Sequence, residues 1–292
     1  TAVQSAAKVC GADVDGAAIG SRDLTFRPGP VVAGEYTFSV GSAGSTMLVL
    51  QTVLPPLLVA GGPSRLTLEG GTHNIYAPPL DFLEKAFLPI LGRMGPKVSV
   101  TLDRAGFYAA GGGRFFATIE PAPRLSPIDL TERGAIKRKL CKAVVAGLSD
   151  EIALRELALV KRSMGWDDQS LQIRQLPDDQ GPGNIVILEI ESDHVTEVFT
   201  GFGQRGVRAE AVAEGAVQHA RKYLSAQVPV GECLADQLIL PFAIARGGSF
   251  VTQPPTRHTR TNIDVVQRFV ATAVTAEPSG RDRSTISFAK SQ

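Results

Sequence analysis

The sequence is poor in several residue classes, and each shortage excludes a kind of protein. Only three cysteines occur among 292 residues, at positions 10, 141 and 233, and their number is odd. This wide spacing does not fit a zinc site or a disulfide framework, and it favours a reducing compartment such as the cytoplasm. The most apolar stretch, residues 47–60, is short and contains a glutamine and two prolines, so it does not predict a membrane span. No signal peptide is visible.

The chain also lacks an excess of charge of either sign. Its 30 Lys and Arg side chains are nearly balanced by 29 Asp and Glu side chains, which leaves a formal net charge of +1. This balance excludes a general polycation of the histone kind, but it allows a local basic groove for nucleic acid. The length suits about two domains.

The first residues have the pattern of the end of a helix. Residues 2–10 are amphipathic, Gly11 is a typical C-terminal stop, and no methionine precedes them. We expect that part of the domain lies before residue 1, either because the chain is processed or because it is a fragment.

Hydrophobic periodicity predicts an α+β protein with helices on one face of a sheet. The expected strands in the first 120 residues are 24–27, 34–40, 65–69, 98–102 and 114–120, and the expected helices are 47–60 and 80–94. The glycine- and serine-rich residues 41–46 precede the first of these helices. They are interpreted either as a simple helix N-cap at Ser45 or Thr46, or as a site for an anion on free backbone N–H groups.

The segment that contains the first of these helices recurs later in the chain. When residues 48–62 are placed beside 234–248, Gln51 falls on Gln237 and both segments end in Gly-Gly. After one deletion, His73 falls on His258. The sequence therefore predicts a duplicated unit.

A segment of different character, about 134–226, separates the two copies. It predicts a compact α/β arrangement with strands at 137–145, 185–190 and 195–200 and helices at 150–164 and 207–225. Its basic run is more typical of a solvated strand edge than of an RNA track; the run comprises Lys137, Arg138, Lys139 and Lys142.

Six motifs occur in a fixed order. They are SAGS before an apolar helix, GGT followed by APP, GFYAAGGG at 106–113, DQGPGN at 179–184, GECLADQL at 231–238 and PTRHTRTN at 255–262. Each motif alone is weak, but the ordered set resembles RNA 3'-terminal phosphate cyclases from about residue 2 to residue 288. The resemblance implies a large domain of repeated βαβαββ units formed by residues 1–133 and 227–292. It also implies that residues 134–226 form a small inserted thioredoxin-like α/β domain.

The resemblance further implies an ATP-dependent enzyme of the ligase type, which converts an RNA 3'-terminal phosphate to a 2',3'-cyclic phosphate. A histidine is adenylated first, AMP passes to the RNA phosphate, and the vicinal 2'-hydroxyl expels AMP, with Mg or Mn assisting. The nucleophile carried over is His258, and no metal ligand is assigned, although Asp236 is a candidate partner for metal or ribose. The nucleotide contacts carried over are Gln51, Cys233, Leu234, Ala235, Asp236 and Gln237.

The sequence departs from the family pattern at a few points. Ala105 and Ala109 alter the glycine-rich motif, and Cys233 stands where an aromatic residue is often found, which weakens adenine stacking. The family's N-terminal segment of roughly fifty residues, about one βα unit, is not in the sequence. Because that segment carries groups that hold phosphates and metal, we expect weak or no adenylation by this chain alone.

Alternative interpretations remain at this point. His73 is the repeat-equivalent competitor for His258 but is expected to be a loop residue without a nucleophilic role, and His194 and His219 are expected on the surface. A cyclase-like RNA-processing or ribosome-assembly factor without catalysis is one rival function, and an enolpyruvyl transferase-like enzyme is another. The presence of His258 together with LADQ favours the cyclase.

Overall fold

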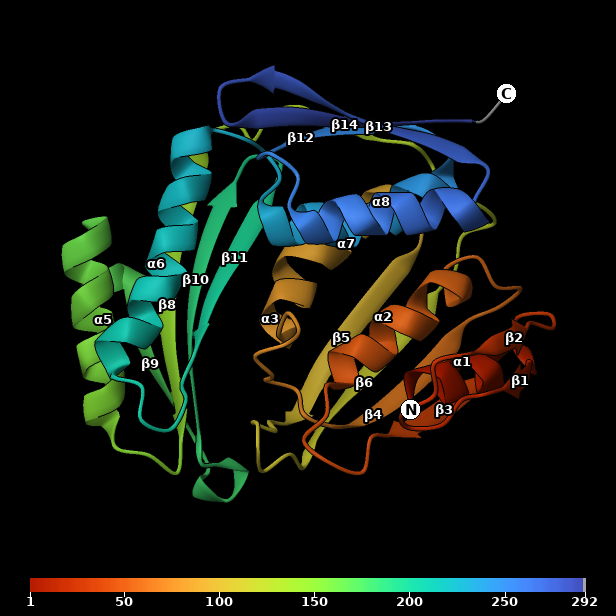
Figure 1. Ribbon diagram of the computed structural model, residues 1–292. Coiled ribbons are helices and arrows are strands. Elements are labelled where there is room, and N and C mark those ends of the chain that lie inside the picture. Colours follow the sequence, from red (N-terminus) through yellow and green to blue (C-terminus); the bar gives the residue numbers. More distant parts are fainter. Residues whose placement is uncertain (291–292) are drawn as a thin grey trace. The chain divides into compact units, whose positions relative to one another are not determined.

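The computed structural model describes residues 1–290, which divide into two compact units (Figure 1). The first unit contains Thr1–Leu80 and Gly95–Leu125, and the second contains Asp81–Met94 and the chain from Ser126 onward. Each unit combines helices with mixed sheets, so the predicted α+β class is confirmed. The thioredoxin-like character of 134–226 and the predicted domain boundaries stay predictions.

The first unit is built on a four-stranded sheet with the order β3-β4-β6-β5. Strands β3 and β4 are parallel, and the other neighbours are antiparallel. Alternation along β4 and β6 buries Leu68 and Phe115 completely, while helix α2 buries Val53 and Leu57. The elements are α1 (Ala2–Cys10), β1 (Asp13–Asp15), β2 (Thr25–Arg27), β3 (Glu35–Ser39), α2 (Thr46–Leu57), β4 (Ser64–Gly70), β5 (Lys97–Arg104) and β6 (Gly113–Glu120).

The segment predicted as one helix at 80–94 is interrupted. It consists of α3 (Leu80–Phe82), a π-helical turn η1 (Leu83–Phe87) and α4 (Leu88–Arg93). Pro89 has no N–H to donate to the carbonyl four residues earlier, and its ring crowds that carbonyl. The regular α-helical ladder is therefore replaced by a wider turn just before the proline.

The second unit contains a four-stranded sheet with the order β11-β10-β8-β9. Helices α5 and α6 lie side by side along this sheet (Figure 1). Trp166, Val186 and Val217 belong to the apolar core between sheet and helices. The elements are β8 (Ile136–Ala146), α5 (Asp150–Met164), the 3-10 turn η2 (Asp168–Ser170), β9 (Leu171–Leu176), the 3-10 turn η3 (Asp178–Gln180), β10 (Gly183–Ser192), β11 (Thr196–Phe202) and α6 (Ala209–Ala226).

A further sheet of the second unit has the order β13-β14-β12-β7. It repeats the topology of the first unit's sheet, with one parallel pair followed by two antiparallel pairs. The predicted duplication is therefore confirmed in the strand order, and β8–β11 with α5 and α6 lie in the chain between β7 and α7. The elements are β7 (Asp129–Leu130), α7 (Glu232–Ala245), β12 (Ser249–Thr252), α8 (Arg257–Phe269), β13 (Thr272–Gly280) and β14 (Arg283–Lys290).

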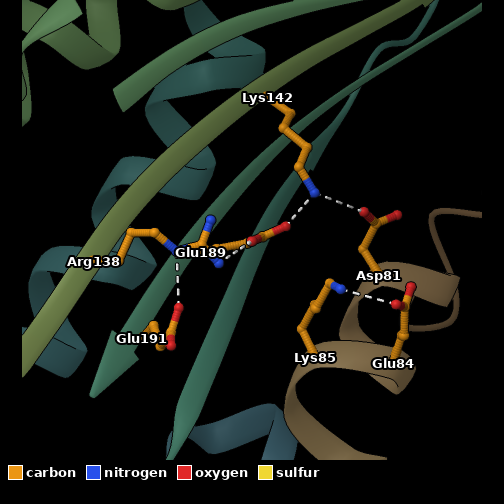
Figure 2. Close-up of polar contacts among 7 residues, drawn as sticks. All are labelled: Asp81, Glu84, Lys85, Arg138, Lys142, Glu189 and Glu191. Carbon is orange, nitrogen blue, oxygen red and sulfur yellow. Dashed lines mark hydrogen bonds and ion pairs between the residues drawn. The ribbon is translucent and has the colours of Figure 1, made fainter. Parts of the chain in front are cut away.

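Two cations of the basic run on β8, Arg138 and Lys142, contact acidic side chains, as Figure 2 shows. Lys142 contacts the carboxylate of the buried Glu189 and lies 3.4 Å from the Oδ1 atom of Asp81. Arg138 Nε donates to Glu191 Oε2 at 2.8 Å. Residues 141–146 of β8 pair with both β10 and β9, whereas residues 136–140 pair with β10 alone. Lys137, Arg138 and Lys139 lie exposed on this open edge, so the predicted solvated strand edge is confirmed for them, while the half-buried Lys142 lies outside it.

Within residues 1–290, no helix combines the length and the apolar character needed to span a bilayer.

Candidate active site

Two helices of the second unit, α7 and α8, carry the residues of the candidate site. Helix α7 is fixed at its C-terminal half by Phe242, whose ring centroid lies 5.2 Å from that of Phe250 on β12 and 5.3 Å from that of Phe288 on β14. All three side chains are buried. The apolar face of α7 is thereby directed to the sheet, which leaves other faces of its first turns available for polar contacts.

The predicted nucleotide-binding segment occupies these first turns of α7, and its residues divide between two faces. Leu234 and Ala235 are only 0% and 2% exposed, whereas Cys233 is exposed and Asp236 and Gln237 are half-buried. Helical geometry explains the division, because neighbouring residues point about 100° apart. Leu234 and Ala235 therefore support the helix from its buried side, and the polar chemistry falls to Asp236 and Gln237.

The predicted nucleophile, His258, lies in the first turn of α8. The helix begins after Thr256, whose hydroxyl accepts the N–H of Thr259 at 3.1 Å. The His258 side chain is 81% exposed, and its Nδ1 atom lies 2.8 Å from Oδ1 of Asp236, which is 13% exposed. Because an ionised carboxylate can only accept hydrogen bonds, Nδ1 is the donor. In the neutral ring, Nε2 then carries the lone pair.

The carboxylate of Asp236 is itself held in place. Asn262, one turn after His258, donates from Nδ2 to the Asp236 backbone carbonyl at 3.0 Å and to Oδ1 at 3.4 Å. Gln237 Nε2 donates to Oδ2 at 3.4 Å. Asn262 was not assigned from the sequence, although it lies inside the PTRHTRTN motif. Its spacing of four residues from His258 was the available signal, since such residues share a helix face.

A buried glutamate marks the beginning of α7. Glu197 on β11 is 1% exposed and accepts the backbone N–H of Gly231, the residue before the helix. Burial raises the pKa of Glu197 to about 8, although hydrogen bonds from the backbone N–H groups of Gly231 and Val198 act in the opposite direction. A Cβ atom on Gly231 would lie 3.1 Å from the carboxyl group, which explains a glycine here. The sequence offered little signal for Glu197 beyond a charge within an apolar strand.

Other ionisable groups lie near these helix starts in the sequence. Desolvation, and then the carboxylates of Glu197, Glu232 and Asp236, raise the pKa of the Cys233 thiol to about 11, so the thiol is neutral at pH 7 although the residue is exposed. Arg257 next to His258 in α8 is exposed. The departure from an aromatic residue at position 233 therefore leaves a neutral thiol at the predicted adenine contact.

Gln51 and the GSAGST turn belong to the first unit. Gln51 is half-buried on α2, and its role as a nucleotide contact stays a prediction. Ser45 is the N-cap of α2, because its hydroxyl accepts the N–H of Leu48 at 3.3 Å. This hydrogen bond supports the simple N-cap interpretation of residues 41–46.

The competing histidine, His73, is in a different environment from His258. It is 4% exposed, its Nδ1 atom lies 2.9 Å from the Thr72 hydroxyl, and its ring stacks on Phe107 with centroids 4.7 Å apart. This packing favours a structural role. His194 and His219 are exposed, as predicted.

The donor set for a metal is sparse. Within residues 1–290, no group of three or more His, Cys, Asp or Glu side chains is arranged to hold a metal ion. Mg²⁺ is commonly held by one or two carboxylates together with substrate phosphates and water. Asp236 stays the predicted candidate for such an arrangement, and its two oxygens accept hydrogen bonds from His258, Asn262 and Gln237. A metal cage made of side chains alone does not fit the described residues.

Comparisons with known proteins agree with this architecture. A family model described as RNA 3'-terminal phosphate cyclase matches residues 1–276. RNA 3'-terminal phosphate cyclases from Koribacter versatilis and Pseudomonas fluorescens are 47% and 48% identical over 270 and 278 residues. These alignments cover 92% and 95% of this chain, and 76% and 81% of the relatives. The cyclase from Ralstonia nicotianae is 48% identical over 288 residues, which are 98% of this chain and 82% of the relative. The chain therefore belongs to the RNA 3'-terminal phosphate cyclase family.

Proposed function

We propose that this chain uses ATP to convert an RNA 3'-terminal phosphate to a 2',3'-cyclic phosphate through an adenylated His258. The observation that carries the proposal is the contact between His258 Nδ1 and Asp236 Oδ1 in an imidazole whose side chain is otherwise 81% exposed. An oriented, accessible imidazole with a lone pair on Nε2 has the requirements of a nucleophile.

The first step forms a bond between Nε2 and the α-phosphorus of ATP, while the bond to the leaving pyrophosphate breaks. Asp236 keeps the proton on Nδ1 and stabilises the positive charge that develops on the ring during attack. Asn262 and Gln237 hold the carboxylate in the orientation that this requires.

The next two steps transfer and then release AMP. An oxygen of the RNA 3'-phosphate attacks the adenylyl phosphorus, and the bond from phosphorus to Nε2 breaks. The vicinal 2'-hydroxyl then attacks the RNA phosphorus, its proton is lost, and AMP leaves as the cyclic phosphate closes. The neutral imidazole is regenerated when the bond from phosphorus to Nε2 breaks, and the net reaction releases AMP and pyrophosphate from ATP.

ATP is the proposed nucleotide, with Gln51 and residues Cys233 to Gln237 as its contacts. A divalent metal, Mg or Mn, would compensate the charge of the phosphate chain when bound to ATP. All three cysteines are free thiols, so we place the activity in the reducing cytoplasm.

The proposal is tested by comparing His258→Ala with His219→Ala in the full-length protein that carries this sequence. Both histidines are exposed and lie on helices, so neither change should disturb the fold. The protein is incubated with ATP, metal and an RNA that ends in a 3'-phosphate, and cyclisation is measured as protection of that phosphate from phosphatase. The His219→Ala protein should produce this protection at the wild-type rate. His258→Ala should leave the end sensitive. Resistance formed at the wild-type rate by His258→Ala would contradict the proposal.

The rival functions receive less support. A non-catalytic assembly factor has no need of an imidazole held by a carboxylate, yet Asp236 and Asn262 form that arrangement around His258. Membership of the cyclase family favours the cyclase over an enolpyruvyl transferase.

A further inference from the structure

Helix α8 presents an exposed row of side chains that begins at His258. Thr261, Val265 and Phe269 follow at intervals of three and four residues, which places all four on one side of the helix. We call this row the α8 stripe. Phe269 is 85% exposed and Val265 is 47% exposed, whereas the opposite side of α8 is buried through Ile263.

Single exposed apolar side chains are common on protein surfaces, but Phe269 and Val265 lie together in one row with His258. Phe269 ends α8 eleven residues after His258, which corresponds to about 16 Å along the helix axis. The position of the exposed ring relative to the nucleophile is therefore fixed by one continuous helix.

The charges beside the α8 stripe are predominantly positive. Arg257 and Arg268 lie next to its two ends in the sequence, and Arg260 lies in the first turn; all three are exposed. Asp264 is the only acidic residue of the helix. Cations interleaved with an exposed aromatic ring are the combination by which proteins bind single-stranded nucleic acid, because the cations contact phosphates and the ring stacks on a base.

We propose that the α8 stripe is the docking surface for the RNA strand immediately upstream of the reacting 3'-phosphate. Phe269 stacks on a base, and Arg268 contacts the adjacent backbone phosphate, while the 3' end lies at His258. At the rise of about 3.4 Å per nucleotide of a stacked strand, the stacked base lies at most about five nucleotides from the 3' end, and fewer if the strand is extended. This inference rests on the proposed function, since it assigns the substrate strand of the same site.

The test uses fluorescence anisotropy to measure how tightly the full-length protein binds a labelled RNA of about ten nucleotides that ends in a 3'-phosphate. Phe269→Ala should weaken binding roughly five-fold or more, the amount expected for one lost stacking contact. Phe269→Trp should retain the wild-type affinity. With a dinucleotide 3'-phosphate, too short to reach Phe269, Phe269→Ala should bind like the wild type. Equal binding of the longer RNA by Phe269→Ala and wild type would overturn the proposal. A loss of affinity for the dinucleotide as large as the loss for the longer RNA would also overturn it.

The arginine is tested by the dependence of binding on salt. Arg268→Ala should lower the slope of log K against log salt by about 0.7, the value for one phosphate of a single strand, whereas Phe269→Ala should leave the slope unchanged. Matched controls come from α5, where Leu154 is 56% exposed and Arg162 lies in the last turn, as Arg268 does in α8. Leu154→Ala and Arg162→Ala should bind like the wild type. An unchanged slope in Arg268→Ala would overturn the assignment of that residue.

Two further readouts distinguish RNA docking on the α8 stripe from a defect in adenylation and from self-association of the chain. Adenylation of the protein by ATP without RNA should be equal in Phe269→Ala and wild type. If the wild type is never adenylated, the proposed function fails, while the anisotropy results still decide whether the α8 stripe binds RNA. The other occupant of an apolar stripe is a second copy of the chain, so a change of oligomeric state in Phe269→Ala during sedimentation would overturn the RNA assignment.

Discussion

The buried Glu197 should make the stability of the second unit depend strongly on pH, and one substitution should remove that dependence. The pKa of Glu197 is raised from 4.5 to about 8 because the carboxyl group has lost its hydration, while Gly231 and Val198 donate their backbone N–H groups to it. In the unfolded chain the group ionises near 4.5. The folded state therefore holds the proton more tightly, so the contribution to stability is complete below pH 4.5 and is lost as the pH rises through about 8.

The size of the effect follows from the shift. A difference from 4.5 to about 8 corresponds to a loss of about 5 kcal/mol once both states are ionised, of which about 3 kcal/mol has been lost at pH 7. Glu197→Gln keeps an oxygen that accepts the N–H of Gly231 but cannot ionise. The variant should therefore resemble the wild type at pH 5 and exceed it by several kcal/mol at pH 9.

Urea unfolding followed by tryptophan fluorescence measures this difference. Trp166 is the only tryptophan of the chain, is 4% exposed, and belongs to the apolar core of the second unit. Glu197 lies in the same unit. Subtracting the wild-type curve from that of Glu197→Gln at each pH isolates the titration of this group. Two curves that stay parallel from pH 5 to pH 9, or a variant that is the less stable at pH 9, would refute the reasoning.

Two further predictions concern the site and the charged cluster of Figure 2. Asp236→Asn removes the negative charge facing His258 Nδ1. Adenylation should therefore slow about 10- to 100-fold, as expected for a lost charge-assisted hydrogen bond, while the melting temperature stays unchanged. Rapid-quench kinetics that match the wild type would contradict this. Lys142→Met removes the closest cation from Glu189, which is 2% exposed, and should lower the free energy of unfolding by about 3–5 kcal/mol in urea titrations. The control Arg155→Met breaks an exposed pair and should cost less than about 1 kcal/mol; equal losses in both variants would contradict the prediction.

The parts of the fold that sequence reasoning predicted well are those with a strong repeated signal. The alignment of Gln51 with Gln237 predicted a duplication, and the sheets β3-β4-β6-β5 and β7-β12-β14-β13 have the same strand order. The long helical pattern of 150–164 predicted α5 to the residue, whereas the strands β5, β6 and β10 extend beyond the ranges predicted for them. The regular helix expected at 80–94 was wrong in its interior, because Pro89 cannot donate to the α-helical hydrogen-bond ladder and a π-helical turn precedes it.

The sequence nominated the motif residues of the candidate site, whose roles stay predictions, but not the residues that surround and hold them. His258 and Asp236 followed from the motifs, and the structure joins them by one hydrogen bond. Neither Glu197 nor the salt-bridged environment of Lys142 was predictable, because partners separated by many residues are chosen by tertiary packing. The burial of His73 is of the same kind, since it depends on Phe107 more than thirty residues away.

The central claim is that His258 Nε2 carries AMP during the reaction, and direct mapping of that adduct is its most decisive test. The full-length protein is incubated with ATP labelled in the α-phosphate, with metal and without RNA, and the labelled peptide is identified by mass spectrometry. We predict an acid-labile, alkali-stable adduct on His258 that is absent from His258→Ala and is discharged on addition of RNA with a 3'-phosphate. A label that persists in His258→Ala, or that maps to His73, would contradict the account.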